Sequence, residues 1–217
     1  MKISARTRQI LKNFALVNQN ILITEGSKIR TLSAGKTVYA EAEVEETFPV
    51  NFGIYDLNEF LGVLGLFSDP DFDFDENYVT IAQGKNSVTY LPADSSVLIF
   101  PKKSLQLKES AVEFDLESES FGSIIKAAGV LKAPFITFIG KNDKIEVIVH
   151  DKTNPNTNRY SVDVGETDQN FEIHIKTEFL SKLLAEKFKV AIYPDKKVVF
   201  NGDGKLYMIA AESDSSI

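Results

Sequence analysis

The chain has 217 residues and no cysteine, which excludes disulfide bonds and thiolate metal sites. Its formal net charge of −7 disfavours the coating of naked DNA, but residues 2–14 contain four bases and no acid. No stretch reaches the ~18 consecutive apolar residues of a membrane helix, and the first residues lack the apolar block of a secretory signal. We therefore expect a protein without membrane contact that meets a partner through one basic surface.

Four segments have apolar side chains at helical spacing. They are residues 4–15, 56–67, 118–131 and 177–187. Short blocks between them alternate apolar and polar residues, as half-buried strands do. Turn sequences such as KNDK (141–144), PDKK (194–197) and NGDG (201–204) separate several of these blocks. The sequence therefore predicts the α+β class, with helices packed on antiparallel sheet.

The two halves of the sequence resemble one another. Glu-Phe-Leu occurs at residues 59–61 and again at 178–180, and Phe-Gly-Ile at 52–54 aligns with Phe-Glu-Ile at 171–173. Each half reads as helix, strands, helix, strands. Because one such unit cannot bury its sheet alone, we expect the units to pack in pairs.

This repeat predicts two similar domains, residues 1–91 and 111–217, separated by a connector of residues 92–110. Pro92 and Pro101 stiffen the connector. The apolar run from Val97 to Phe100 within it fits a short buried strand and a partner-binding segment equally well.

Three patterns that resemble catalytic or metal sites lack essential parts. AGKT (34–37) has no glycine five positions before its Gly-Lys pair, so a hairpin turn is favoured over a phosphate-binding loop. The acidic alternation DPDFDFDE (69–76) lacks the glycine of a calcium loop and fits a strand with its acids facing water. His150 and His174 have no triad or metal-ligand spacing. We therefore expect no enzyme activity, cofactor or metal.

The first predicted helix has one apolar face and one basic face. The apolar face contains Ile3, Thr7, Ile10, Leu11 and Phe14. The basic face contains Lys2, Arg6, Arg8 and Lys12. The predicted helices at 118–131 and 177–187 each turn one base, Lys126 and Lys182, away from the core. Such bases, without interleaved aromatic residues, indicate phosphate contact that does not read base sequence.

Several segments closely resemble the sliding clamps of T4-type bacteriophages, the polymerase processivity factors. They are LKNFA (11–15), YAEA (39–42), IYDLNEFLGVL (54–64) and AAESD (210–214). The resemblance implies the DNA-clamp fold, with two similar domains of two helices each on antiparallel sheet. It also implies a pseudo-symmetric ring of three identical subunits around duplex DNA, bound without sequence preference. The basic residues above would then face the DNA.

The resemblance further implies partners and surfaces. Besides duplex DNA, the partners would be the C-terminal tail of a DNA polymerase and an ATP-driven clamp loader, in the cytoplasm of an infected bacterial host; transcription factors are left open. One edge strand at 86–91 would pair with a neighbour's 159–164, assigning the subunit interface to Ser87, Val88, Thr89, Tyr90, Tyr160, Ser161, Val162 and Asp163. The pocket for partner tails would contain Val97, Leu98, Ile99, Phe100, Ile209, Ala210 and Ala211. The alternative is a trimeric β-rich virion protein without enzyme activity.

Overall fold

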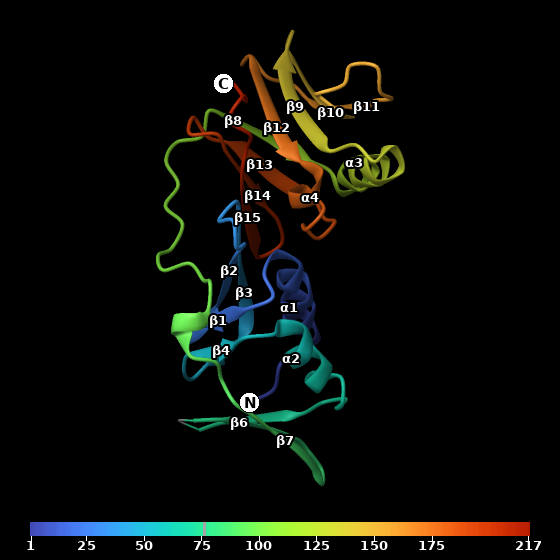
Figure 1. The fold of residues 1–217 in the computed structure, drawn as a ribbon. Helices are drawn as coiled ribbons and strands as arrows, with labels where there is room; N and C mark the ends of the chain where they lie inside the picture. Colours follow the sequence, from blue (N-terminus) through green and yellow to red (C-terminus); the bar gives the residue numbers. More distant parts are fainter. Residues whose placement is uncertain (76) are drawn as a thin grey trace. The chain divides into compact units, whose positions relative to one another are not determined.

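The structure is a computed structural model that describes residues 1–75 and 77–217. Glu76, the last residue of the acidic stretch at 69–76, lies outside the described residues. The chain divides into two compact units, Met1–Ser104 and Leu105–Ile217. Each unit is an α+β arrangement of helices and antiparallel strands (Figure 1).

The first unit begins with a helix and continues with two groups of strands. Its elements are α1 (Ala5–Val17), β1 (Ile21–Ile23), β2 (Gly26–Leu32), β3 (Val38–Phe48), β4 (Phe52–Ile54), α2 (Leu57–Leu64), β5 (Asp71–Phe74), β6 (Val79–Gln83), β7 (Asn86–Tyr90) and the 3-10 turn η1 (Ser95–Val97). β1 pairs with β4 and β2 pairs with β3, both antiparallel. β5, β6 and β7 form a three-stranded sheet with β6 at its centre.

The second unit repeats this order after one additional strand. Its elements are β8 (Val112–Leu116), α3 (Ser118–Leu131), β9 (Phe135–Lys141), β10 (Lys144–His150), β11 (Tyr160–Gly165), β12 (Phe171–Lys176), α4 (Thr177–Leu180), β13 (Phe188–Ile192), β14 (Lys197–Asn201) and β15 (Lys205–Ala210). One sheet has the order β11-β10-β9-β12. In the other, β13 pairs with both β8 and β14, and β14 pairs with β15.

The internal repeat predicted from the sequence is also seen in equivalent backbone hydrogen bonds of the two units. Gly53 in β4 and Glu172 in β12 are equivalent positions of the repeat, and in each unit the segment after the last strand returns to this point. The Ala93 amide donates to the Gly53 carbonyl at 2.9 Å. Ser216 and Glu172 exchange two backbone hydrogen bonds of 2.8 and 2.9 Å. The two units therefore share a folding pattern as well as a sequence pattern.

The predicted apolar face of the first helix is confirmed. Ile3, Thr7, Ile10, Leu11 and Phe14 are all buried. Ser4 is the N-cap residue, and its side-chain oxygen accepts from the Thr7 amide at 3.2 Å. The carboxylate of Glu46 in β3 also accepts hydrogen bonds from the Ser4 amide and the Thr7 hydroxyl. The start of α1 is thus held by its cap and by the neighbouring strand.

Aromatic residues fill the core of each unit. In the first unit, Tyr90 makes edge contacts with Phe52 and Phe60, at ring-centroid distances of 5.8 and 5.2 Å. In the second, Phe188 lies 5.2 Å from Phe121. Phe60 is fully buried, so the repeated Glu-Phe-Leu motif supplies a core anchor there. Burial of such a side chain stabilises the fold by about 1.5–3 kcal/mol.

The predicted helix at 177–187 is wrong beyond its first turn. α4 ends at Leu180, and residues 181–187 form turns and bends instead. The carboxylate of Glu186 forms an ion pair with the buried Lys205 at 2.8 Å and lies against Gly202. This contact with the hairpin at 201–204 holds the segment in a non-helical path.

The other helix and turn predictions agree more closely with the structure. Asp56 caps α2 by accepting from two backbone amides. α3 begins at Ser118, but its N-cap is Glu117, which makes no side-chain cap hydrogen bond. The stretch 34–37 forms the β2–β3 hairpin, with Lys36 at φ 57°. Residues 71–74 of the acidic stretch form β5, where Phe72 is buried and Asp71 and Asp73 are exposed.

Candidate functional site

The bases in and before α1 differ in their solvent exposure. Lys12 is exposed, whereas Arg6 and Arg8 are half-buried. Lys2 precedes the helix and forms an ion pair with Asp69, which raises its pKa. Asp69 therefore neutralises part of the charge at Lys2, and the assignment of the four bases to a DNA-facing surface stays a prediction.

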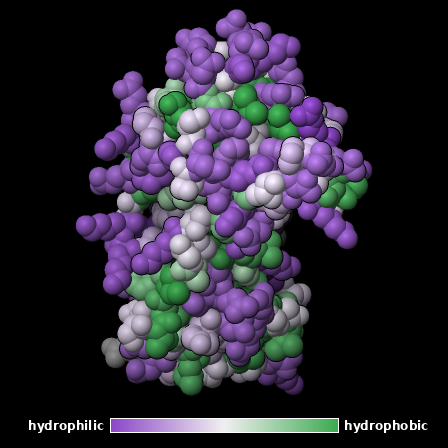
Figure 2. Space-filling view, turned by 45° about the horizontal axis from the view of Figure 1, so that its top comes forward, coloured by the Kyte–Doolittle hydropathy of each residue, from purple (hydrophilic) through white to green (hydrophobic). Residues whose placement is uncertain are grey.

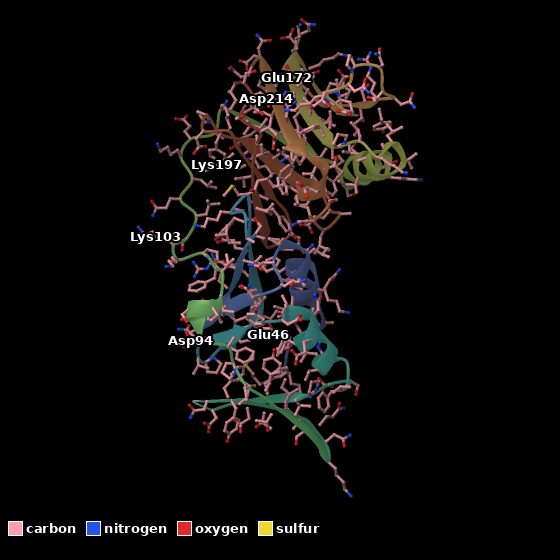
Figure 3. All side chains as sticks on the ribbon, in the orientation of Figure 1. Glu46, Asp94, Lys103, Glu172, Lys197 and Asp214 are labelled. Carbon is pink, nitrogen blue, oxygen red and sulfur yellow. The ribbon has the colours of Figure 1, made fainter. Side chains whose placement is uncertain are left out.

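Arg8 lines a hollow of about 610 Å³ at the start of α1. Its Nε atom is buried without a hydrogen-bond partner. Glu46 lines the same hollow (Figure 3). Burial raises the pKa of Glu46, but hydrogen bonds from Ser4 and Thr7 outweigh this effect, and the net pKa is below its ordinary value. Glu46 therefore remains charged at neutral pH as a structural acceptor for the helix start.

The two bases predicted in the second unit have different surroundings. Lys182 follows α4 in the non-helical segment, so the helical geometry assumed for it is wrong. Lys126 is exposed on α3 and lines a hollow of about 430 Å³ together with Arg159 and Tyr160 at the start of β11. Lys126 thus lies next to a strand predicted to form the subunit interface.

The two predicted interface strands are edge strands. In the described part of the chain, β7 pairs only with β6 within its sheet, and β11 pairs only with β10 within its sheet. Each has half-buried residues alternating with exposed ones: Val88 and Tyr90 alternate with Thr89, while Tyr160 and Val162 flank Ser161. Unpaired backbone groups along such edges are a template for pairing with another chain.

The apolar run of the connector is fixed to the first unit. Leu98 is buried, and its side chain lies within about van der Waals distance of Gly53. The Ile99 amide donates to Asn20 Oδ1 at 2.8 Å, and the Ile99 carbonyl accepts from Asn18 Nδ2 at 3.1 Å. Of the two alternatives, a short buried strand is wrong, because the run begins in the 3-10 turn η1.

One residue of the predicted pocket for partner tails lies in the core, while Ala210 and Ala211 are half-buried. Ile209 is fully buried in the core, so its side chain does not line an open surface. The structure instead has a hollow of about 320 Å³ at the start of the second unit. Leu107, Tyr193 and Pro194 contribute its apolar lining, and Lys197, labelled in Figure 3, contributes a base. Figure 2 shows other apolar patches on a largely hydrophilic face.

Sequence reasoning did not identify Asn18 and Asn20 as connector anchors. Asn18 is buried and also donates to the Leu32 carbonyl at 2.8 Å. An Asn pair at a helix end suggests local capping, and nothing in the local pattern indicates a hydrogen bond across 81 residues. The only signal was the presence of two Asn residues directly after a strongly amphipathic helix.

The two histidines share a hydrogen-bond partner. His150 Nε2 and His174 Nδ1 each lie 2.8 Å from the hydroxyl of Thr137 on β9. Burial lowers the pKa of both imidazoles; for His150 the charge of His174 adds to this effect. The described residues contain no cluster of three or more metal-ligating side chains, and none of the described helices has the length and apolarity to span a membrane.

These features define a two-unit α+β protein with a basic helix, open sheet edges and an anchored connector, which is the architecture of DNA clamps. The fold matches the structure of proliferating cell nuclear antigen from Entamoeba histolytica with a TM-score of 0.73, at 13% identity over 97% of each chain. Residues 4–100 match the family model of the DNA polymerase processivity factor.

Two curated relatives are the sliding clamps of Vibrio phage KVP40 and Escherichia phage RB69. Each is 31% identical, covering 98% of this chain and 100% of the relative in the first case, and 100% and 99% in the second. The chain belongs to the sliding-clamp family of T4-like phages, the DNA polymerase processivity factors. This membership displaces the alternative of a virion structural protein.

Proposed function

We propose that the chain is one subunit of a homotrimeric ring that encircles duplex DNA and tethers a replicative DNA polymerase in an infected bacterial cell. The observation that carries the proposal is the basic face of α1 on a chain whose net charge is −7. An acidic protein with one basic helix repels DNA from most of its surface and admits it at one place.

The small number of bases suits sliding better than tight binding. A protein that neutralises Z phosphates loses affinity with salt at a slope of about −0.9Z. Arg6, Arg8, Lys12 and Lys182 give each subunit only a few phosphate contacts, so electrostatic attraction alone would hold the ring weakly at physiological salt. Topological linkage then keeps the protein on DNA while the weak contacts permit movement.

Ring closure would use the open edges of β7 and β11. Ser87, Val88, Thr89 and Tyr90 of one copy would pair with Tyr160, Ser161, Val162 and Asp163 of the next. Such pairing satisfies two rows of backbone groups and hides two edges that would otherwise invite aggregation. A head-to-tail contact of this kind forms a ring when the rotation between copies closes. An ATP-driven loader would open one such interface.

The partner's C-terminal tail would bind in the hollow that contains Leu107, Tyr193 and Pro194. Apolar lining with a few polar groups is the usual composition of such sites. Val97 to Phe100 are left out of this proposed site, because Leu98 is buried and both backbone groups of Ile99 are already hydrogen-bonded within the first unit. Leu107→Ser should weaken binding of a polymerase-tail peptide, whereas Leu16→Ser, at an exposed leucine on α1, should not.

The decisive experiment measures topological retention. The protein is loaded onto nicked circular DNA with a T4-type loader and ATP, and the complex is separated from free protein by gel filtration. Cutting the circle once should release the protein within minutes. Retention on linear DNA without blocked ends would contradict the ring proposal, because direct binding would then account for the association.

A further inference from the structure

Residues 212–217, which follow β15, lie along the outer side of β12, and we call them the strap. β12 and β11 are the two end strands of the sheet β11-β10-β9-β12, so the strap lies at the opposite edge from β11. Glu172 of β12 and Asp214 of the strap are labelled near this edge in Figure 3. An edge strand exposes a row of backbone groups with which another segment can pair, so the contacts of the strap show what this edge accepts.

The strap satisfies the outward backbone groups of two β12 residues, but only in part as a strand does. Glu172 and Ser216 exchange two backbone hydrogen bonds, of 2.8 and 2.9 Å. At His174 the pairing is irregular, because its carbonyl accepts from the Glu212 amide at 2.9 Å whereas its amide donates to the side-chain oxygen of Ser215 at 3.0 Å. The strap turns between these two positions, and the Ser215 amide donates to the Glu212 carbonyl at 3.1 Å. A fully extended segment would supply backbone groups at both positions.

Lysines from three places in the second unit hold the strap. Lys152 Nζ lies 2.7 Å from both carboxylate oxygens of Asp214, and this contact lowers the pKa of Asp214. Lys176 Nζ, at the end of β12, lies 3.7 Å from a carboxylate oxygen of Glu212. Lys196 Nζ donates to a strap carbonyl at 2.6 Å. The edge of β12 is therefore lined by bases, and the segment that occupies it carries two acids.

The strap contributes little to the hydrophobic core. Of its six side chains only that of Ser215 is buried, and its one apolar side chain, that of Ile217, is 44% exposed. In the first unit, by contrast, the equivalent contact at Gly53 is supported by the buried side chain of Leu98. Hydrogen bonds and exposed ion pairs are individually weak because water competes for the same groups. The strap can therefore open while the sheet beneath it stays folded.

We propose that the outer edge of β12 binds an extended acidic peptide segment of a partner protein, and that the strap competes with that segment for the site. The partner segment would pair with Glu172 and His174 through its backbone, as in other cases of strand addition. Its carboxylates would lie near Lys152 and Lys176, where the strap places its own two acids. Binding then requires release of the strap, so the chain regulates access to its own site. The proposal goes beyond the ring and involves neither β7 nor β11.

Hydrogen exchange on the full chain tests the opening of the strap. The amides of Glu172 and His174 should exchange at least tenfold faster than that of Ile173, which faces β9 because alternate residues of a strand pair on opposite sides. Asp214→Lys sets a like charge beside Lys152 and should accelerate the first two amides by about a further tenfold. Adding Lys152→Glu to this variant restores opposite charges and should return both rates to those of the wild type. Equal exchange at the three amides of the wild type would overturn the proposal, since the strap would then open only with the sheet.

Peptide binding tests the docking site. A fluorescent peptide with the sequence of residues 211–217 should bind the full-length Asp214→Lys variant at least tenfold more tightly than the wild type, because a larger fraction of the variant has its edge free. The same peptide with lysine at both acidic positions should bind at least tenfold more weakly. Asp73→Lys is the matched control, since it makes the same charge change at an exposed aspartate of the first unit. Equal peptide affinities of Asp214→Lys and Asp73→Lys would overturn the docking site.

Two further measurements separate strand addition from simple charge attraction. Ser216→Pro removes the amide that donates to Glu172 without changing the charge, so it should also increase peptide affinity; an affinity equal to that of the wild type would overturn the proposal. A single-stranded DNA oligonucleotide should not displace the peptide from Asp214→Lys at equal concentration. Displacement would overturn strand addition, because the lysines alone would then account for binding. A failure in any of these tests leaves the proposed ring untouched, since none of them measures assembly or DNA retention.

Discussion

The side-chain amide of Asn18, at the end of α1, donates to the carbonyl of Ile99 in the connector at 3.1 Å. The neighbouring Asn20 accepts from the amide of the same residue at 2.8 Å. Both backbone polar groups of Ile99 are thus hydrogen-bonded to the two asparagines that lie within three residues of the end of the basic helix. The helix proposed to face DNA and the segment that leads to the second unit are therefore held by one local contact.

Asn18→Ala should destabilise the protein by about 1–3 kcal/mol, because it leaves the Leu32 and Ile99 carbonyls without their donor. Amide exchange at Ile99 should also accelerate. Urea unfolding and hydrogen exchange measure the two effects. Asn20→Asp is the matched control, since it retains the accepting oxygen and should protect the Ile99 amide. Unchanged exchange in Asn18→Ala would show that the connector is held elsewhere.

Gly53→Ala should displace the connector from β4. A Cβ atom at this position would lie 2.2 Å from the Ala93 carbonyl oxygen and 3.0 Å from the Leu98 side chain. We expect a loss of a few kcal/mol in unfolding free energy, as for overpacked core sites. Gly62→Ala provides the contrast, because its Cβ meets nothing within 4 Å. It should stabilise α2 by up to about 1 kcal/mol; equal effects in both variants would refute the steric explanation.

The sequence predicted correctly those features that depend on residues close together in the chain. The buried face of α1 and the Asp56 cap follow from spacing and residue type alone, and the structure contains both. α4 was predicted too long because its apolar spacing continues past Leu180, whereas the Glu186–Lys205 ion pair determines the path of the chain. Glu186 and Lys205 come close only when the strands of the sheet have paired, so the sequence pattern around either residue does not reveal the contact.

For the candidate surfaces too, the sequence predicts local features but not contacts between distant segments. A base on a helix face is visible in the sequence, but whether it lies beside an open sheet edge depends on strand order. Lys126 has helical spacing suited to a DNA-facing residue, yet it shares a hollow with Arg159 at the edge of β11. Asn18 shows the same limit, because its partner Ile99 is remote in the chain.

The histidine pair predicts a fall in stability on acidification. Both imidazoles have a folded-state pKa below the ordinary value of 6.5, so the unfolded chain binds more protons in this range. Their contribution is complete above about pH 6.5 and is lost as pH falls through the folded-state pKa values. Glu172, Asp151, Asp214 and Glu212 act against this shift, whereas Arg159 and Lys152 reinforce it.

Urea midpoints at pH 7.5 and 5.5 measure this effect, with His174→Gln as the comparison. The variant removes the buried imidazole and should lose less stability between the two pH values than the wild type does. Thr137→Val removes the shared hydroxyl and should destabilise the protein at both. An identical pH dependence in wild type and His174→Gln would show that His174 does not cause the acid sensitivity.

Charge reversal on α1 should separate DNA engagement from folding. Arg6→Glu, Arg8→Glu and Lys12→Glu together alter half-buried and exposed positions while leaving the apolar face intact, so the unfolding transition should remain cooperative. Loading onto circular DNA and processive synthesis should fall at least tenfold, because acids would then face phosphates where bases now attract them. Lys36→Glu, Lys85→Glu and Lys103→Glu change net charge equally at exposed turns and connector positions. If that control impaired loading as strongly as the α1 variant, net charge and not the basic face of α1 would govern contact with DNA.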